Sequence, residues 1–278
     1  MSSYYQKEQN GCAATDSPEP ALVFFDIDGT LVGNRPEPPD SAVDAIRRLR
    51  RGGHLAFINT GRPLSTVTRS LLQIGFDGVV ASCGAYVSYA GQELLNRTID
   101  PAILAVVLPA LCEAKIDFWL EGRDQVYISD YRPGGSMEQV IGWLKQADAR
   151  ISAWHEPHLE ANKISFQLCG DSDYERCRPI LEQHFQIIRH NQENGELLLP
   201  GLTKASGIQL LLEHLHLPQS NTYAFGDSLN DLDMLTYVHY GIAMGNSRGQ
   251  VRRISDHSTA SQEEDGILLG LRHYNLIE

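Results

Sequence analysis

The chain has 278 residues, of which 42% are hydrophobic and 21% are charged, a balance that is ordinary for a folded globular protein with a substantial core. Its formal net charge of −12 argues against a general binder of nucleic acid or of anionic membranes, since nothing offsets repulsion from phosphate groups. A small phosphorylated metabolite is compatible with this charge as a partner, because it needs only a local positive pocket.

The sequence predicts a cytoplasmic protein with a polar N-terminal tail, residues 1–20. The tail lacks the apolar core of a signal peptide, and no later run approaches the roughly 20 apolar residues of a membrane span. The five cysteines are odd in number and scattered, with no C-x-x-C pair. They suit thiols in a reducing cytosol better than a disulfide framework or a zinc site.

Strand and helix patterns alternate over residues 21–84, which are predicted to form the first part of a core domain. Such alternation favours parallel strand pairing and a doubly wound, Rossmann-like α/β sheet. The predicted strands are 21–26, 54–60 and 77–82, and the predicted helices are 41–53, capped by Asp40 or Ser41, and 63–73.

Residues 85–196 mix hairpins with helices and are predicted to form an inserted α+β cap domain. Alternation returns over residues 197–278, which are predicted to complete the core domain. The expected elements are a hairpin over 85–97, helices over 101–114, 136–147, 173–185, 203–217, 229–238 and 265–274, and strands over 116–122, 125–130, 162–170, 221–227 and 240–245.

The segment FFDIDGTLV, residues 24–32, ends an apolar strand with Asp26 and Asp28. In a strand these two side chains point to the same face and repel each other, and burying an unpaired carboxylate is costly. Structure alone gives no reason for the two aspartates. The rest of the chain must therefore supply a counter-charge.

Two further segments offer groups that suit a phosphate. INTGR, residues 58–62, supplies the Thr60 hydroxyl and lets a ligand approach the backbone at Gly61, just before a predicted helix whose first amides favour an anion. Lys204 stands in the first turn of another predicted helix, where it opposes the helix dipole. Most such lysines are solvated, but beside carboxylates and a phosphate the position makes sense.

The segment FGDSLNDLDML, residues 225–235, ends a strand with Asp227 and continues with Asn230 and Asp231. In an open parallel sheet, ligands bind beyond the carboxyl ends of the strands, so the fold can bring all these segments to one edge. Three carboxylates at that edge favour a divalent cation. Oxygen ligands in a small active centre indicate Mg²⁺, which normally keeps waters and shares a substrate phosphate.

The order DxDGTL, TGR, a lysine before a helix and GDxxND resembles the haloacid dehalogenase-like phosphatases. The insertion between the second and third motifs resembles the Cof-type branch with its large α/β cap of type C2B. GIAMGNS and DGILLGL resemble the C-terminal pattern of the same branch. The resemblance covers roughly residues 21–275. One departure is Cys83-Gly84-Ala85, where the family usually has Asn-Gly-Ala near the hinge into the cap.

The resemblance implies a role for each matching residue. Asp26 would be the nucleophile that becomes an aspartyl phosphate, and Asp28 would protonate the leaving alcohol and then deprotonate the attacking water. Mg²⁺ would be held by the Asp26 carboxylate, the Asp28 backbone carbonyl and Asp227. The phosphoryl oxygens would be bound by Thr60, Lys204, Asn230 and the backbone of Ile27 and Gly61, while Asp231 would orient Lys204 or a metal-bound water.

The expected function is Mg²⁺-dependent hydrolysis of small phosphomonoesters, such as sugar phosphates or cofactor phosphates. Two alternatives use the same site: a phosphotransferase or phosphomutase, if an acceptor hydroxyl outcompetes water, and a non-catalytic sensor of a phosphorylated ligand. The sequence predicts no oligomeric state. The residues of the inserted segment considered for substrate contact are Trp119, Glu121, Arg123, Tyr127, His155, His158 and Lys163.

Overall fold

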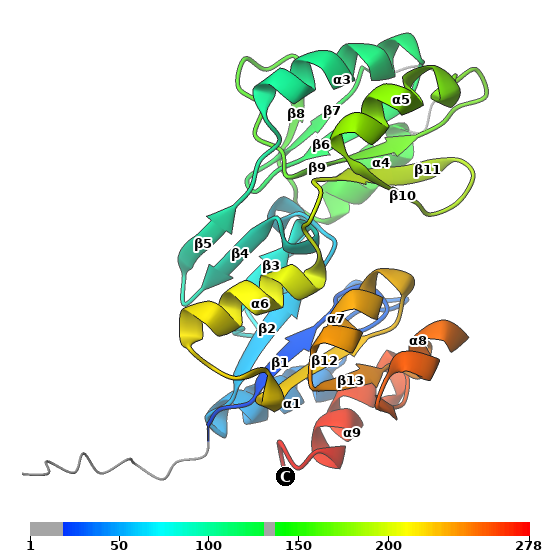
Figure 1. Ribbon diagram of the computed structural model, residues 1–278. Helices are drawn as coiled ribbons and strands as arrows, with labels where there is room; N and C mark the ends of the chain where they lie inside the picture. Colours follow the sequence, from blue (N-terminus) through cyan, green and yellow to red (C-terminus); the bar gives the residue numbers. More distant parts are fainter. Residues whose placement is uncertain (1–18, 131–136) are drawn as a thin grey trace, which may run out of the picture.

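The computed structural model in Figure 1 describes residues 19–130 and 137–278. Of the predicted tail, only residues 19 and 20 are described. Cys12 lies outside the described residues. The strands of the described residues form an eight-stranded and a six-stranded sheet. None of the helices in these two ranges is long and apolar enough to cross a lipid bilayer.

The eight-stranded sheet is parallel from its first edge to β3 and ends in an antiparallel hairpin. Its central strand β1 pairs with β12 on one side and β2 on the other, both parallel. This arrangement confirms the predicted doubly wound sheet. In spatial order the strands are β14 (His257–Ser258), β13 (Tyr240–Ala243), β12 (Thr222–Gly226), β1 (Leu22–Phe25), β2 (Leu55–Asn59), β3 (Gly78–Ala81), β4 (Tyr86–Tyr89) and β5 (Gln92–Asn96).

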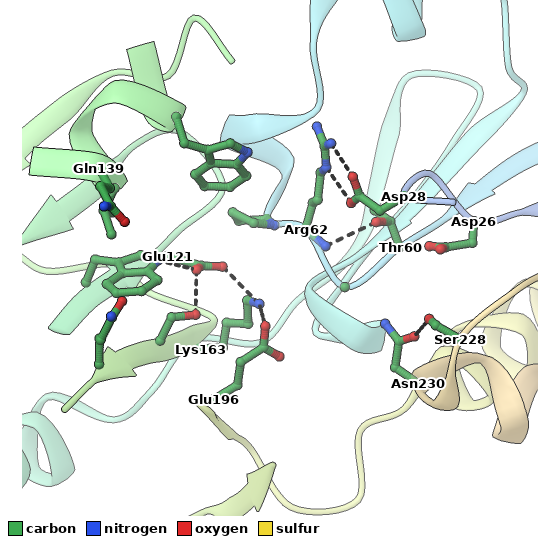
Figure 2. Close-up of a pocket in the computed structure, with 17 residues that line it drawn as sticks. Asp26, Asp28, Thr60, Arg62, Glu121, Gln139, Lys163, Glu196, Ser228 and Asn230 are labelled. Atoms are coloured by element: carbon green, nitrogen blue, oxygen red, sulfur yellow. Dashed lines mark hydrogen bonds and ion pairs between the residues drawn. The ribbon is translucent and has the colours of Figure 1, made fainter. Parts of the chain in front are cut away.

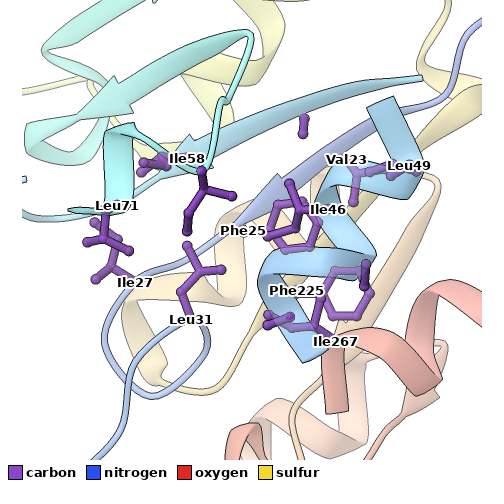
Figure 3. Packing of buried hydrophobic residues seen from close by; sticks show 14 of the residues in the cluster. Val23, Phe25, Ile27, Leu31, Ile46, Leu49, Ile58, Leu71, Phe225 and Ile267 are labelled. Atoms are coloured by element: carbon purple, nitrogen blue, oxygen red, sulfur yellow. The ribbon is translucent and has the colours of Figure 1, made fainter. Parts of the chain in front are cut away.

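Both faces of this sheet are covered by helices, which is why β1 is apolar at every position. Val23 and Phe25 pack with Ile46 and Leu49 in one hydrophobic cluster (Figure 3). The alternate strand positions pack into a second cluster on the opposite face. The helices are α1 (Asp40–Arg51), α2 (Arg69–Leu72), α6 (Lys204–Leu215), α7 (Leu232–Tyr237), α8 (Gly249–Ile254) and α9 (Gly266–His273).

The six-stranded sheet has one apolar and one polar face. Phe118, Leu120, Ile164 and Phe166 lie in a hydrophobic cluster that includes residues of α3 and α5. The sheet is antiparallel except for β7 beside β8. Its strands in spatial order are β10 (Gln186–Arg189), β11 (Asn194–Leu198), β9 (Lys163–Gln167), β6 (Asp117–Glu121), β7 (Val126–Ile128) and β8 (Ile151–Ala153), and its helices are α3 (Pro101–Glu113), α4 (Met137–Gln146) and α5 (Tyr174–His184).

At two helices of residues 21–84 the structure differs from the prediction. The helix expected over 63–73 is a 3₁₀ turn, Leu64–Thr66, followed by the short α2. Consecutive β-branched residues oppose a continuous helix here, and Val67 is extended. The helix α1 begins at Asp40, without the predicted side-chain cap.

The hairpin β4–β5 pairs with β3 in the eight-stranded sheet, whereas the sequence-based boundary at residue 85 had assigned it to the inserted segment. Strands β8, β10, β11 and β14 and helix α8 had no predicted counterpart. Strands β8 and β14 have only three and two residues, too few to give an apolar pattern. The division of the chain into units ending at residues 84 and 196 stays a prediction.

The close packing of α6 on β3 generates a test of the fold. A Cβ at Gly207 would lie 2.3 Å from Val80 Cγ1, whereas a Cβ at the exposed Gly142 of α4 meets nothing within 4 Å. We expect Gly207→Ala to lower the free energy of unfolding by about 1–3 kcal/mol through overpacking. Gly142→Ala should raise it by about 0.5–1 kcal/mol, the ordinary helix gain. Urea denaturation followed by circular dichroism measures both, and a neutral Gly207→Ala would contradict this packing.

Candidate active site

The predicted polar segments converge at the carboxyl ends of three neighbouring strands. The chain runs from β1 through β2 to β3 on one side, and from β12 to β13 on the other. An open parallel sheet has a crevice where its strand order reverses in this way. Asp26 follows β1, Thr60 follows β2 and Asp227 follows β12, so these residues share one edge.

One buried ammonium lies between two buried carboxylates at this edge. Lys204 Nζ lies 2.7 Å from Asp26 Oδ1 and 2.6 Å from Asp231 Oδ1. Each of the three side chains is exposed by 3% or less. A buried charge is stable only when it is paired, so Lys204 is the counter-charge that Asp26 of the first motif requires.

Lys204 reaches Asp26 because it is the first residue of α6. Thr203 caps this helix: the Ser206 N–H donates to Thr203 Oγ1 at 3.2 Å, and the Thr203 N–H donates to Ser206 Oγ at 2.9 Å. Asn59 Nδ2 donates a hydrogen bond of 3.1 Å to the carbonyl of Lys204. The helix start is therefore fixed to the end of β2.

Asp231 and Thr30 fix the loop that carries Asp227. Asp231 Oδ2 accepts the N–H of Asp227 at 3.0 Å and of Ser228 at 2.9 Å. Thr30 Oγ1 donates to Asp227 Oδ1 at 3.0 Å. Gly29 has a φ of +89°, and a Cβ there would lie 2.2 Å from Asp227 Oδ2. Only glycine fits this close approach.

Asp26, Asp227 and Asp231 form a carboxylate cluster with oxygen atoms within 4.8 Å of one another. Burial and Asp231 raise the pKa of Asp26 to about 8, and Lys204 opposes this effect. Burial and Asp231 also raise the pKa of Asp227 to about 6. Burial lowers the pKa of Lys204, but the two carboxylates outweigh it and raise that pKa above its ordinary value. The oxygen donors and the excess negative charge suit a divalent cation such as Mg²⁺.

The Asp28 carboxylate lies outside this cluster and is bound by Arg62. Arg62 Nε lies 2.8 Å from Asp28 Oδ2, and Nη2 lies 2.5 Å from Oδ1. The Asp28 side chain is 59% exposed. Arg62 Nη1 also donates to the Thr66 carbonyl at 3.3 Å, and the guanidinium lies 6.0 Å from the ring centroid of Trp143. Arg62 ends the TGR motif, yet sequence analysis assigned it no role.

Some of the residues expected to bind phosphate line a cavity beside Asp26, and others do not. Thr60, Gly61 and Asn230 line a cavity beside Asp26, and Thr60 is buried while Asn230 is exposed. The side chain of Ile27 is buried in the hydrophobic core. Lys204, Asp227 and Asp231 do not line this cavity, but Lys204 contacts Asp26 directly.

The cavity has a volume of about 430 Å³ (Figure 2). It is lined by residues at the edge of the eight-stranded sheet and by residues of the six-stranded sheet and α4. Asp26, Asp28 and Arg62 lie on one side, and Glu121 and Lys163 face them from the six-stranded sheet. Ser65 Oγ donates to the Gly122 carbonyl at 2.8 Å and so links the two sides.

Three of the residues considered from the inserted segment line the cavity, namely Trp119, Glu121 and Lys163. Four others do not, namely Arg123, Tyr127, His155 and His158. Glu196 and Trp143 also line it and were missed by sequence analysis. Glu196 lies on β11, a strand that was not predicted. The sequence pattern did not distinguish Trp143 from the other apolar residues of its predicted helix.

Comparison with known proteins extends the likeness over nearly the whole chain. Residues 23–271 match the family described as haloacid dehalogenase-like hydrolase. The YkrA protein of Bacillus subtilis strain 168 is 30% identical over 262 residues, which cover 92% of this chain and 98% of YkrA. YitU of the same strain, named a 5-amino-6-(5-phospho-D-ribitylamino)uracil phosphatase, is 26% identical over 276 residues, covering 92% and 98% of the two chains.

A solved structure shows the same fold. A protein of Geobacillus kaustophilus HTA426 aligns with a TM-score of 0.83 and 27% sequence identity. The alignment covers 93% of this chain and 100% of the other. The two chains therefore share one fold over almost their whole length.

The shared ammonium of Lys204 can be tested by its removal. Lys204→Met leaves the buried carboxylates without a counter-charge, so we expect the free energy of unfolding in EDTA at pH 8 to fall by about 3–5 kcal/mol. The deficit should shrink as the pH falls, because a carboxylate that gains a proton no longer needs the ammonium. Urea denaturation at several pH values measures this loss.

Lys145→Met is the matched control, because Lys145 is an exposed lysine of α4. It should change the free energy of unfolding by no more than about 0.5 kcal/mol. Equal losses in the two variants, or a loss for Lys204→Met that does not depend on pH, would contradict the paired arrangement.

Proposed function

The chain belongs to the haloacid dehalogenase-like hydrolases, among the Cof-type phosphatases, and from that premise we propose that it hydrolyses small phosphomonoesters in a Mg²⁺-dependent reaction through a phosphoryl group on Asp26. The observation that carries the proposal is the placement of Asp26. Its carboxylate lines the cavity at the carboxyl end of the central strand and contacts Lys204 at 2.7 Å. A nucleophile needs such a fixed position, and a neighbouring positive charge stabilises the negative phosphoryl oxygens.

Two chemical steps follow from these residues. An oxygen of Asp26 attacks phosphorus, the bond from phosphorus to the leaving oxygen breaks, and Asp28 gives its proton to that oxygen. Water then attacks the phosphorus on Asp26 while Asp28 takes the proton from the water. The bond from the Asp26 oxygen to phosphorus breaks, and inorganic phosphate leaves. Thr60, the Gly61 backbone, Asn230 and Lys204 bind the phosphoryl oxygens in this scheme.

Asp26 and Asp227 are the side chains proposed to hold Mg²⁺, together with the Asp28 backbone carbonyl. Asp231 already uses one oxygen for Lys204 and the other for two backbone N–H groups, so it is better suited to orient its neighbours. A bound divalent cation supplies charge neutralisation for the phosphoryl group. This ligand set rests on oxygen atoms alone, which suits Mg²⁺.

The pairing of Asp28 with Arg62 defines what has to change before proton transfer. Arg62 holds both Asp28 oxygens, so at least one of these bonds must open before Asp28 carries a proton. Arg62 also lies over Trp143 of α4, which lines the opposite side of the cavity. A substrate that binds between Arg62 and Trp143 would therefore also change the hydrogen bonds from Arg62 to the Asp28 carboxylate.

The substrate is proposed to be a small phosphorylated metabolite of the cytoplasm. A cavity of about 430 Å³ holds a small molecule and leaves no room for a macromolecule. YitU, a relative of similar length, is named for a phosphomonoester with a ribityl chain. Sugar phosphates and cofactor phosphates therefore stay the favoured classes.

Hydrolysis of p-nitrophenyl phosphate tests the proposal. We expect turnover with Mg²⁺, loss of turnover with excess EDTA and recovery when Mg²⁺ is added back. Asp26→Asn should reduce kcat by at least about 10³-fold, because the amide is no nucleophile for phosphorus. Steady-state release of p-nitrophenolate measures all of these effects.

Asp44→Asn is the control, because it is the same substitution at an exposed aspartate of α1. It should keep the wild-type rate. Turnover that needs no metal and persists in Asp26→Asn would contradict the assignment of the site.

A further inference from the structure

The six-stranded sheet turns a buried polar face toward the cavity. Trp119 and Glu121 alternate with apolar residues along β6, and Lys163, Ser165 and Gln167 do so along β9. Side chains two residues apart in a strand share a face, so all five point the same way. On a free sheet such a face would be solvated, yet Glu121, Lys163 and Ser165 are each exposed by less than 5%.

Three charged side chains on this face form an ion triad, Glu121–Lys163–Glu196. Lys163 Nζ lies 3.0 Å from Glu121 Oε2 and 2.8 Å from Glu196 Oε1. Glu121 Oε1 accepts hydrogen bonds of 2.7 Å from Ser165 Oγ and from Trp119 Nε1. With both carboxylates ionised, these three groups carry one net negative charge. His190 also contacts the triad, with Nε2 3.4 Å from Glu196 Oε1.

Stability does not explain this triad. Removing three charged groups from water costs free energy that their attraction seldom exceeds, and well-packed apolar residues of similar volume are often as stable or more so. The opposite face of the same strands shows that this sheet packs apolar side chains readily. A function at the cavity accounts for the retained charges better than folding does.

The triad lies opposite the catalytic aspartates across the same cavity (Figure 2). A phosphomonoester whose phosphoryl group reaches Asp26 therefore directs its leaving group toward Glu121, Lys163 and Glu196. Trp119 and Trp143 line the space between with aromatic surface, and Trp119 is fixed by its hydrogen bond to Glu121. The wall thus offers aromatic faces, two carboxylate acceptors and one ammonium donor.

We infer that the ion triad Glu121–Lys163–Glu196 is a specificity site that selects uncharged, polyhydroxylated leaving groups and rejects leaving groups that carry a second anion. This inference rests on the proposed phosphatase function. Hydroxyl groups donate to the two carboxylates and accept from Lys163, so a polyol satisfies both kinds of partner. A carboxylate or second phosphate meets the net negative charge of the triad in a site of low dielectric, where repulsion is strong.

Sorbitol 6-phosphate and 6-phosphogluconate form a matched pair of probes, because they differ only in a terminal hydroxymethyl or carboxylate group. At pH 8 we expect kcat/KM to favour sorbitol 6-phosphate by roughly ten- to hundredfold. Release of inorganic phosphate with saturating Mg²⁺ measures this preference in the wild-type protein. An equal or reversed preference overturns the inference without any variant.

Glu196→Gln removes the net charge of the triad at its most exposed member, whose side chain is 21% exposed. We expect the preference for sorbitol 6-phosphate to narrow by about fivefold or more, since a charged leaving group no longer faces an unbalanced carboxylate. The matched control is Glu193→Gln, on an exposed glutamate at the β10–β11 turn outside the cavity. This control should keep the wild-type preference.

The failures of the two proposals are distinguishable. Hydrolysis of p-nitrophenyl phosphate with Mg²⁺, but with no preference between the two six-carbon esters or with turnover of neither, overturns the specificity site alone. An unchanged preference in Glu196→Gln, or an equal change in Glu193→Gln, does the same. No hydrolysis of any of the three esters overturns the phosphatase proposal, and the inference falls with it.

Discussion

Lys204 places one ammonium between two carboxylates that the chain buries at the end of its central strand. Without it, Asp26 and Asp231 would be unpaired charges in a region with almost no solvent exposure, at a cost of several kcal/mol. The rest of the site depends on this contact. Asp231 is held by it and in turn orients the backbone of Asp227, while Asn59 anchors the start of α6 that delivers the lysine.

The doubly wound sheet explains why residues so far apart in the sequence meet. Residues 26 and 204 are separated by the whole six-stranded sheet in the chain, yet both lie at the edge where the strand order reverses. The inserted strands contribute the opposite wall. Because their polar face is turned toward the aspartates, the cavity is bounded by Asp26 of the carboxylate cluster at one side and by the ion triad at the other.

Much of this architecture could be predicted from the sequence. Apolar strands followed by aspartates, and helices between them, are sufficient to predict a parallel sheet with polar residues at its carboxyl edge, and the structure confirms that fold class. The Lys204 contact with Asp26 also follows once the two segments share an edge. These features depend on local patterns and on a general rule for parallel sheets.

Other features depend on tertiary contacts that a local pattern does not carry. Arg62 was missed because its partner Asp28 is 34 residues away and belongs to another strand end. Glu196 was missed because its place beside Lys163 is set by the register of β11 on β9. The β4–β5 hairpin pairs with β3, although the predicted boundary placed it in the inserted segment, since a hairpin sequence does not say which edge it joins.

The central claim is that Asp26 carries the phosphoryl group, and the Asp28→Asn variant tests it most directly. A p-nitrophenolate leaving group needs little protonation, so the first step should proceed while the second lacks its base. Rapid mixing with p-nitrophenyl phosphate and Mg²⁺ should give a burst of about one p-nitrophenolate per protein. Acid quenching and peptide mass spectrometry should then find a phosphoryl adduct on Asp26. No burst and no adduct, or an adduct on another residue, would contradict the account.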